Sequence, residues 1–229
     1  MAYYTNPKNL IDNQILTNGL IFYVDASKTK SYPATGTAWT DISINAFSGT
    51  LTNGPTYSAG SILLDGSDDY VTFGSVSLGI TNTVTVSIWI NFAKLTNNNY
   101  YTFFSFGGWT ANSFIIQRAG DSGDPLRVAW GGYAFTDGPI FRTGSAWKNI
   151  VVVINAGAVS KWYVNNVSTN GTGTTFSVSG PKTLELGRRG DGLQYTNAYI
   201  GECQVYNRAL SANEVSYNYN IRKGRYGLS

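Results

Sequence analysis

Short segments of β-forming residues recur along most of the chain at intervals of roughly 8–12 residues, separated by turns rich in Gly, Pro, Asn and Asp. Residues 84–92 alternate Val, Ile and Phe with Thr, Ser, Trp and Asn, which is the period of a strand. Residues 150–154 are β-formers without interruption, and Asn165-Asn166 fits a two-residue hairpin turn. Helical periodicity is nearly absent. The pattern predicts an all-β sandwich of two antiparallel sheets.

Two features indicate that the predicted sheets are covered on both faces. Residues 19–26 form an almost continuous apolar run, which is typical of a fully buried strand. Trp89 lies on the opposite face of its strand from the aliphatic residues, so that face is expected to be covered too. A chain of 229 residues with 42% apolar and 13% charged residues fits one folded domain of this class.

Residues 198–215 combine a strand with the start of a helix. The segment begins with β-forming residues and breaks at Asn207-Arg208. Ser211 is then a good N-cap, and Glu214 three positions later completes a capping box. One short helix is therefore predicted near the C-terminus.

We divide the chain into three parts. Residues 1–17 are polar and lack periodicity, so we expect an N-terminal arm; residues 18–216 form the sandwich domain. Residues 217–229 form a basic tail with Arg222, Lys223 and Arg225, expected to lie along the surface or to dock on a partner. Cys203, the single cysteine, lies in a predicted strand and is expected to be buried; no intramolecular disulfide can form.

Five motifs carry a resemblance to a known family. They are Phe-Tyr-Val-Asp-Ala at 22–26, Trp-x-Asp at 39–41, Gly-Thr-Leu at 49–51, Leu-Asp-Gly-x-Asp-Asp-Tyr-Val at 64–71 and Tyr-Asn-Arg-Ala-Leu-Ser at 206–211. Their order resembles laminin-G-like jelly rolls of the concanavalin A-like lectin/glucanase group. The residues of these motifs are most similar to those of the domain copies found in tailed-bacteriophage structural proteins. The resemblance spans residues 19–215 and implies a concanavalin A-like jelly roll.

Because this group includes glycoside hydrolases, catalysis has to be considered. Retaining hydrolysis needs two carboxylates about 5 Å apart. The related glucanases carry Glu-x-Asp-x-x-Glu, and neither Glu185 nor Glu202 is followed by the required acids; Glu214, the third glutamate, is the helix cap. Histidine is absent, which removes the commonest general base and metal ligand. We therefore expect no enzymatic activity.

Sugar binding is the activity that the loops favour. Such sites stack aromatic rings on sugars and add hydrogen bonds from Asn, Asp and Arg side chains on loops. The candidate residues are Trp109, Tyr133, Arg188, Arg189, Asp191 and Tyr195. The alternative is structural: the rings of Trp109 and Tyr133 would be half-buried loop anchors, and the two arginines would be solvated or paired with Asp191.

Calcium is the one cofactor considered. The resemblance implies that relatives sometimes hold Ca²⁺ through loop carboxylates, and Asp121 and Asp124 are the candidate ligands here. Residues 65–69 offer further oxygen atoms. Both segments are equally well explained as ordinary Asp-Gly turns.

These observations favour a non-catalytic structural or decoration protein on a bacteriophage particle, with possible adhesion to glycans. The alternative is a carbohydrate-binding receptor module of a tail or fibre, and a glucanase is disfavoured. Other virion proteins would contact the arm and tail. The sequence leaves open whether the chain forms a homo-oligomer. A net charge of +3 does not imply nucleic acid, and no apolar run suits a membrane. Without an apolar N-terminal segment we expect no secretory signal, and hence a virion protein made in the host cytoplasm.

Overall fold

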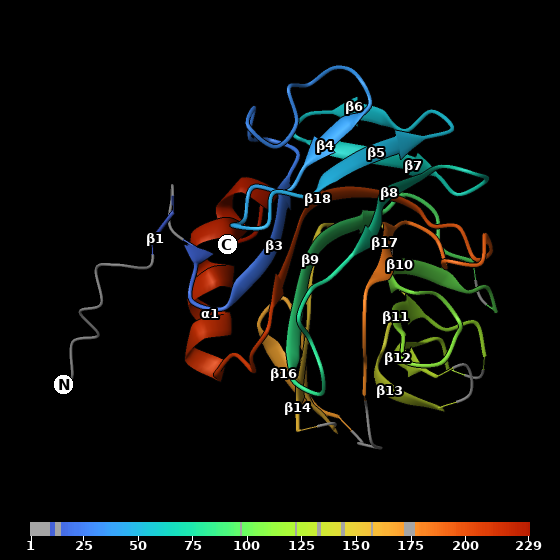
Figure 1. Cartoon of the computed structure of the whole chain (residues 1–229), viewed down its shortest axis with the longest axis vertical. Helices are drawn as coiled ribbons and strands as arrows, with labels where there is room; N and C mark the ends of the chain where they lie inside the picture. The colour runs from blue at the N-terminus through green and yellow to red at the C-terminus, as the bar shows by residue number, and fades with distance from the viewer. Residues whose placement is uncertain are drawn as a thin grey trace.

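The computed structural model describes residues 10–11, 15–96, 98–121, 123–131, 134–142, 145–156, 158–171 and 177–229. Figure 1 shows two layers of β-strands, with one helix packed on the outside of one layer. Among the described residues, no helix has the length and apolar character needed to cross a membrane.

The elements are β1 (Leu10–Ile11), β2 (Ile15–Leu16), β3 (Leu20–Asp25), β4 (Ala38–Thr40), β5 (Ser48–Thr52), β6 (Thr56–Ser58), β7 (Ser61–Asp65), β8 (Tyr70–Val76), β9 (Val84–Phe92), β10 (Tyr101–Phe106), β11 (Phe114–Arg118), β12 (Pro125–Trp130), β13 (Ala134–Ile140), β14 (Lys148–Asn155), β15 (Ala158–Val164), β16 (Val167–Asn170), β17 (Lys182–Leu186), β18 (Asn197–Tyr206), α1 (Ala212–Arg222) and the 3-10 helix η1 (Lys223–Tyr226).

The strands form two large antiparallel sheets. The front sheet has the order β13-β12-β11-β10-β17-β8-β5-β4. The back sheet has the order β16-β15-β14-β9-β18-β7-β6, with β3 also paired to β18. Strand β18 is central, since its first half pairs with β7, its second half pairs with β3, and β9 runs along its other edge. This confirms the predicted all-β sandwich of two antiparallel sheets.

The main core lies between the two sheets. It is formed by aliphatic and aromatic side chains from both layers, including Trp39, Phe92, Phe103 and Trp162, all at most 1% exposed. Every residue of β3 is buried, as the apolar run predicted. Cys203 is buried in β18, also as predicted. Asn165 and Asn166 both have positive φ (49° and 66°), as a type I′ hairpin turn requires.

Helix α1 covers the outer face of the back sheet. Ser211 caps it and forms the predicted capping box with Glu214. Val215 and Tyr219 are buried against the sheet. Trp89 stacks between Tyr219 and Tyr226, with ring centroids 5.7 and 4.2 Å away, so the expected cover over Trp89 is the C-terminal segment.

The C-terminal residues therefore differ from the expected surface tail. Residues 217–222 complete α1, and two of the basic side chains point into the body of the protein. Arg222 Nε lies 3.4 Å from Glu202 Oε2, and Arg225 Nη1 lies 2.8 Å from Asp25 Oδ1. Asp25 and Glu202 are both fully buried, so a nearby cation stabilises each of them when it is ionised. Two of the basic residues expected along the surface or on a partner thus lie beside carboxylates of β3 and β18.

The N-terminal arm lies mostly outside the described residues, since residues 1–9 and 12–14 are not among them. Strands β1 and β2 form a small hairpin. Ile15 is fully buried, and the Leu16 backbone N–H donates to Asn218 Oδ1 of α1 at 3.0 Å. The last residues of the expected arm thus pack on the C-terminal helix.

Candidate functional site

The outer face of the front sheet carries a row of polar side chains. In β11 and β12, Ile116 and Val128 point into the core, while Gln117 and Arg127 alternate with them and share the opposite face. In the next strand, Asp137 lies directly opposite Arg127. Strand alternation therefore places an amide, a guanidinium and a carboxylate side by side on the outer face.

Two loops fold over this face and are pinned to each other. Ser105 Oγ, at the end of β10, accepts hydrogen bonds from the backbone N–H groups of Gly108 (3.2 Å) and Gly190 (3.1 Å). A Cβ added to Gly190 would lie 3.0 Å from the Cα of Gly108, so the two backbones meet without side chains. The loop after β10 carries Trp109, and the loop after β17 carries Arg189. Ser105 and the two glycines thus fix where these side chains lie.

The loops and the sheet enclose an open hollow of about 470 Å³, which we call the front hollow. Its size falls in the range typical of small-ligand sites. The lining residues combine three aromatic rings with two amides, two arginines and one carboxylate: Tyr100, Trp109, Gln117, Asp121, Arg127, Phe135, Arg189 and Gln194. Phe135 is 47% exposed, which is unusual for a large apolar side chain and places its ring in reach of a ligand.

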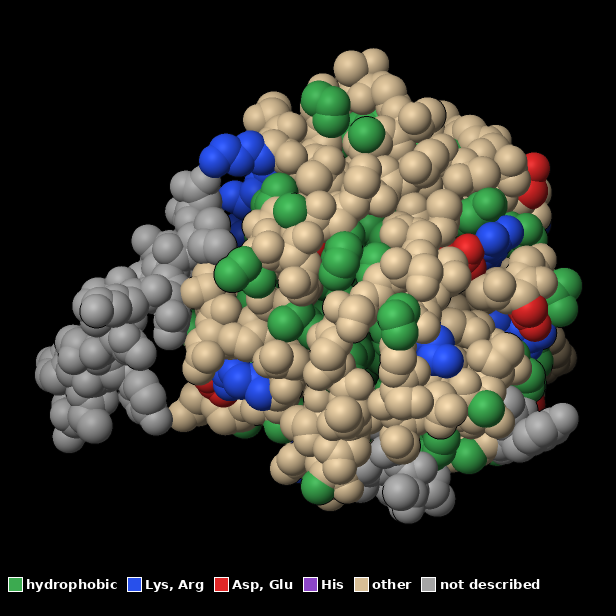
Figure 2. Space-filling model, in the orientation of Figure 1, with side chains coloured by type: hydrophobic (Ala, Val, Ile, Leu, Met, Phe, Trp, Pro, Cys, Tyr) green, Lys and Arg blue, Asp and Glu red, His purple; other side chains and the backbone are tan. Residues whose placement is uncertain are grey.

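The charges of the front hollow are neutralised within it. Arg127 forms a bidentate pair with Asp137, and its Nη1 lies 2.7 Å from Asp121 Oδ2. Its guanidinium also lies 3.8 Å from the centre of the Phe135 ring. Burial lowers the pKa of Arg127, but hydrogen bonds to Asp137 and Asp121 outweigh burial and raise it. Figure 2 shows blue and red side chains side by side at the right, where Figure 1 places β10–β13.

Trp109 and Arg189 meet across the two loops. The Arg189 guanidinium lies 5.3 Å from the centre of the Trp109 ring. Its Nε donates to both carboxylate oxygens of Asp191, at 2.8 and 3.0 Å. The expected pairing of an arginine with Asp191 is thus present for Arg189. Trp109 is half-buried, so it is both a loop anchor and an accessible ring.

A single hydroxyl holds the two glutamines of the hollow. Thr102 Oγ1 lies 3.2 Å from the side-chain oxygen of Gln117 and 3.0 Å from that of Gln194. One hydroxyl hydrogen can serve only one of these oxygens, so the other glutamine must turn its NH₂ group toward Thr102. Within the described residues, the remaining amide atom of Gln194 has no hydrogen-bond partner, and it is available to a ligand.

A second open hollow of about 490 Å³ adjoins the first, and we call it the rim hollow. It is formed by the β7–β8 turn and by the loops before β10 and β18; its lining includes Asp65, Thr96, Tyr100, Gln194, Tyr195 and Asn197. Arg188 lies beneath it, 2.7 Å from Glu185 Oε1 and 3.4 Å from the centre of the Tyr70 ring. Burial lowers the pKa of Arg188, whereas hydrogen bonds to Glu185 and Tyr195 raise it more strongly. Arg188 is therefore engaged by Glu185 and the Tyr70 ring.

The two predicted calcium ligands do not fit a calcium site, because each faces an arginine. Asp124 Oδ1 lies 2.9 Å from Arg118 Nη2, and Asp124 Oδ2 lies 3.3 Å from Arg142 Nε. Asp121 is paired with Arg127 in the front hollow. A guanidinium thus supplies the positive charge at each carboxylate, and a bound cation would be repelled at the same distance.

In the other acidic turn considered for calcium, residues 65–69, the carboxylates already accept hydrogen bonds from the turn itself. Asp65, Asp68 and Asp69 bring ligand atoms within 4.8 Å of one another. Asp65 Oδ1 accepts the backbone N–H of Ser67, which lowers the Asp65 pKa. Asp69 accepts the backbone N–H of Asp65, while burial raises the Asp69 pKa. These contacts are those of a closed Asx-type turn.

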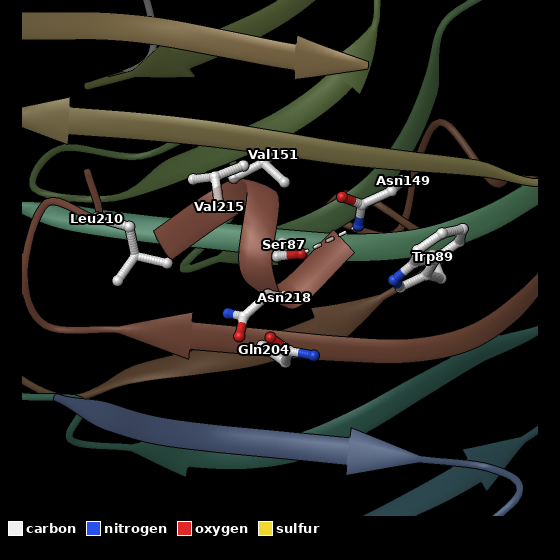
Figure 3. A pocket seen from close by; sticks show the side chains of 8 residues that line it. All are labelled: Ser87, Trp89, Asn149, Val151, Gln204, Leu210, Val215 and Asn218. Carbon is white, nitrogen blue, oxygen red and sulfur yellow. Dashed lines mark hydrogen bonds between the residues drawn. The ribbon is translucent and has the colours of Figure 1, made fainter. Parts of the chain in front are cut away.

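A third cavity lies beneath α1 and is too small for a sugar. Its volume is about 10 Å³, enough for about one water molecule. Figure 3 shows Ser87 and Gln204 of the back sheet near Asn218 of the helix, with Asn149 turned toward Ser87. Asn149 Nδ2 donates to Ser87 Oγ at 3.1 Å. This cavity belongs to the packing of α1 on the sheet.

The structure brings together part of the predicted sugar-binding set. Trp109 and Arg189 line the front hollow and Asp191 pairs with Arg189, whereas Tyr195 lines the rim hollow. Tyr133 lies outside the described residues. Sequence reasoning missed Gln117, Arg127, Phe135 and Gln194 as lining residues. The signal for Gln117 and Arg127 was present: each is a polar residue that alternates with apolar core residues within a buried strand.

The model of the family described as the concanavalin A-like lectin/glucanases superfamily matches residues 65–216. No curated protein matches the chain in sequence.

Among solved structures, domain 4 of AbnA, a GH43 extracellular arabinanase from Geobacillus stearothermophilus solved with arabinotriose, is similar, with a TM-score of 0.67 and 20% identity. The match covers 88% of this chain and 97% of that one. The binding domain of botulinum neurotoxin DC, in complex with SialylT, has a TM-score of 0.70 and 13% identity, over 89% of this chain and 52% of that one. Trypanosoma rangeli sialidase with sialic acid has a TM-score of 0.66 and 13% identity, over 92% of this chain and 34% of that one. At these identities the similarity establishes the fold.

Proposed function

The chain belongs to the concanavalin A-like lectin/glucanases superfamily, and we propose that it is a non-catalytic carbohydrate-binding module. The observation that carries the proposal is the composition of the front hollow. Aromatic rings, amides and internally neutralised charges converge there on an accessible face of the sheet.

This composition matches the two-sided chemistry of a sugar ring. A sugar presents C–H groups on its faces and hydroxyl groups around its edge. Trp109 and Phe135 offer apolar surfaces for the faces. Gln117 and Gln194 offer amide donors and acceptors for the hydroxyl groups. Because Arg127 and Arg189 are already paired with carboxylates, the hollow favours an uncharged ring over a strongly acidic one.

The carboxylates of the front hollow are arranged for structure rather than for hydrolysis. Asp121 and Asp137 are both bonded to Arg127, whose guanidinium lies between them. A glycosidase needs that space for the glycosidic oxygen and the attacking group. The three glutamates are likewise paired, Glu185 with Arg188, Glu202 with Arg222 and Glu214 with Arg208.

The ligands of the similar solved structures support the proposal of sugar binding. The arabinanase domain was solved with arabinotriose and the sialidase with sialic acid. Both ligands are carbohydrates, and each is bound by a protein that contains a domain of this fold. We therefore include arabinan fragments and sialylated glycans among the probes.

The test is a glycan array probed with the whole chain and with two variants, Trp109→Ala and Phe135→Ala. We expect binding by the wild type and an affinity loss of at least about tenfold in each variant, since exposed aromatic anchors dominate such sites. Tyr217→Ala is the matched control, because Tyr217 is an aromatic residue of α1, 37% exposed on the other side of the sandwich. An array without signal, or equal binding by all variants, contradicts the proposal.

Catalysis is tested separately on any glycan that binds. We expect no release of reducing sugar over a prolonged incubation. Turnover that disappears in Asp121→Asn would show that the acid beside Arg127 is catalytic after all, and would overturn the non-catalytic assignment.

A second proposal concerns where the module works. On the resemblance of the sequence motifs to those of bacteriophage structural proteins, we propose display on a virion surface, with the N-terminal segment contacting neighbouring subunits. Mass spectrometry of purified particles should detect the chain, and deletion of residues 1–14 should lower its incorporation. Purified particles that lack the chain contradict this location and leave sugar binding untouched.

A further inference from the structure

We propose that the front hollow and the rim hollow are neighbouring subsites of one groove, and that the ligand is an oligosaccharide of at least two units that fills both. This inference rests on the proposed sugar-binding function and specifies its ligand as a chain rather than a single sugar.

The two hollows share a wall. The two hollows have nearly equal volumes of about 470 and 490 Å³, and both are lined by Tyr100 and Gln194. Each volume alone lies in the range of a small-ligand site. A single sugar on Trp109 would leave the rim hollow filled with water, whereas a chain would pass over Tyr100 and Gln194 into it.

The shared wall offers a polar contact at the point where a chain would cross it. Gln194 has one amide atom fixed by Thr102 Oγ1, as described above. Its other amide atom has no partner among the described residues. A linkage oxygen or a hydroxyl on either side of the wall can hydrogen-bond to this atom, so one side chain serves both subsites.

Hydrogen bonds from a buried arginine hold the loop that carries Tyr100. Tyr100 follows a loop whose carbonyl groups at Thr96 and Asn99 accept hydrogen bonds from Arg118 Nη1, at 2.9 and 2.7 Å. Arg118 is fully buried and is paired with Asp124. Asp124, which sequence reasoning assigned to calcium, thus helps to hold the loop that separates the hollows. A preformed groove avoids the entropy cost of ordering a loop on binding.

An aromatic ring lies on each side of the shared wall. Trp109 lies in the front hollow and Tyr195 in the rim hollow. The neighbouring Arg188 is paired with Glu185 and stacks on the Tyr70 ring, and a hydrogen bond to Tyr195 contributes to the raised pKa of this arginine. Two rings at either side of a shared wall suit two successive sugar units.

The experiment starts from an array that presents each glycan type as single sugars and as chains of two to six units. The best series is then titrated by ¹⁵N NMR, which detects weak single-sugar binding, and by calorimetry. We expect the trisaccharide to bind at least about tenfold more tightly than the single sugar. Tyr195→Ala should lower trisaccharide affinity about tenfold and change single-sugar affinity less than about twofold. Tyr217→Ala should change neither.

The outcomes separate this inference from the function on which it rests. No binding to any array glycan overturns both. Binding that depends on Trp109 but is equal for single sugars and chains, and is unchanged in Tyr195→Ala, overturns the two-subsite groove alone. Amide shifts confined to the front hollow with a bound trisaccharide would do the same.

Discussion

Tyr226 provides a sharp test of the finding that the C-terminal segment is part of the fold. Its ring is 7% exposed and stacks on Trp89 with centroids 4.2 Å apart and planes 11° from parallel. It also contacts Trp147 at 4.6 Å. Replacing a buried aromatic residue with Ala costs about 3–5 kcal/mol. We expect Tyr226→Ala to lower the free energy of unfolding by this amount.

The Tyr226 hydroxyl gives the test a matched control. Its oxygen is buried and has no hydrogen-bond partner among the described residues. An unpaired buried hydroxyl is destabilising by about 1 kcal/mol or more. Tyr226→Phe should therefore keep the stack and equal or exceed wild-type stability. Urea unfolding followed by tryptophan fluorescence measures both variants. A Tyr226→Ala variant within about 0.5 kcal/mol of the wild type would refute the claim that this segment belongs to the cooperative unit.

Three further predictions follow from the structure. Burial raises the pKa of Glu202 to about 8 from its usual 4.5, so between these pH values the native state binds more protons than the unfolded chain. The free energy of unfolding should therefore fall as pH rises across this window, by at most about 1.4 kcal/mol per pH unit. Urea unfolding at a series of pH values measures this profile, and Glu202→Gln should flatten it. Since Asp121 and Asp124 already face arginines, glycan affinity measured by calorimetry should be unchanged by EDTA or added calcium, and a loss on chelation would reveal a metal site. In Gly190→Ala the new methyl would press on Gly108 and separate the two loops, which should weaken glycan binding at least about threefold while the unfolding midpoint changes little.

The sequence was most informative where structure is determined locally. The apolar run of β3, the alternation of β9 and the capping box at Ser211 are short-range patterns, and each element forms where it was predicted. Strand β13 was missed because Gly138 and Pro139 interrupt its pattern. It lies at the edge of the front sheet, where a missing backbone N–H is tolerated.

The site was predictable only in part, because its residues come from distant segments. Trp109 and Arg189 were identified as loop residues of the right chemistry, but their contact depends on the close approach of Gly108 and Gly190. Asp124, considered as a calcium ligand, illustrates the same limit. Nothing near Asp124 in the sequence shows that Arg118 is buried against it. The basic C-terminus was expected to lie along the surface or to dock on a partner, because its carboxylate neighbours lie on β3 and β18, far away in the chain.

The central claim is that the front hollow binds sugar without cleaving it. The most direct measurement is a crystal structure of the chain soaked with the glycan that binds best on the array. We predict an intact glycan with one ring against Trp109 and hydrogen bonds to Gln117 or Gln194. A glycan bound elsewhere on the surface, or a cleaved product beside Asp121, would contradict the account.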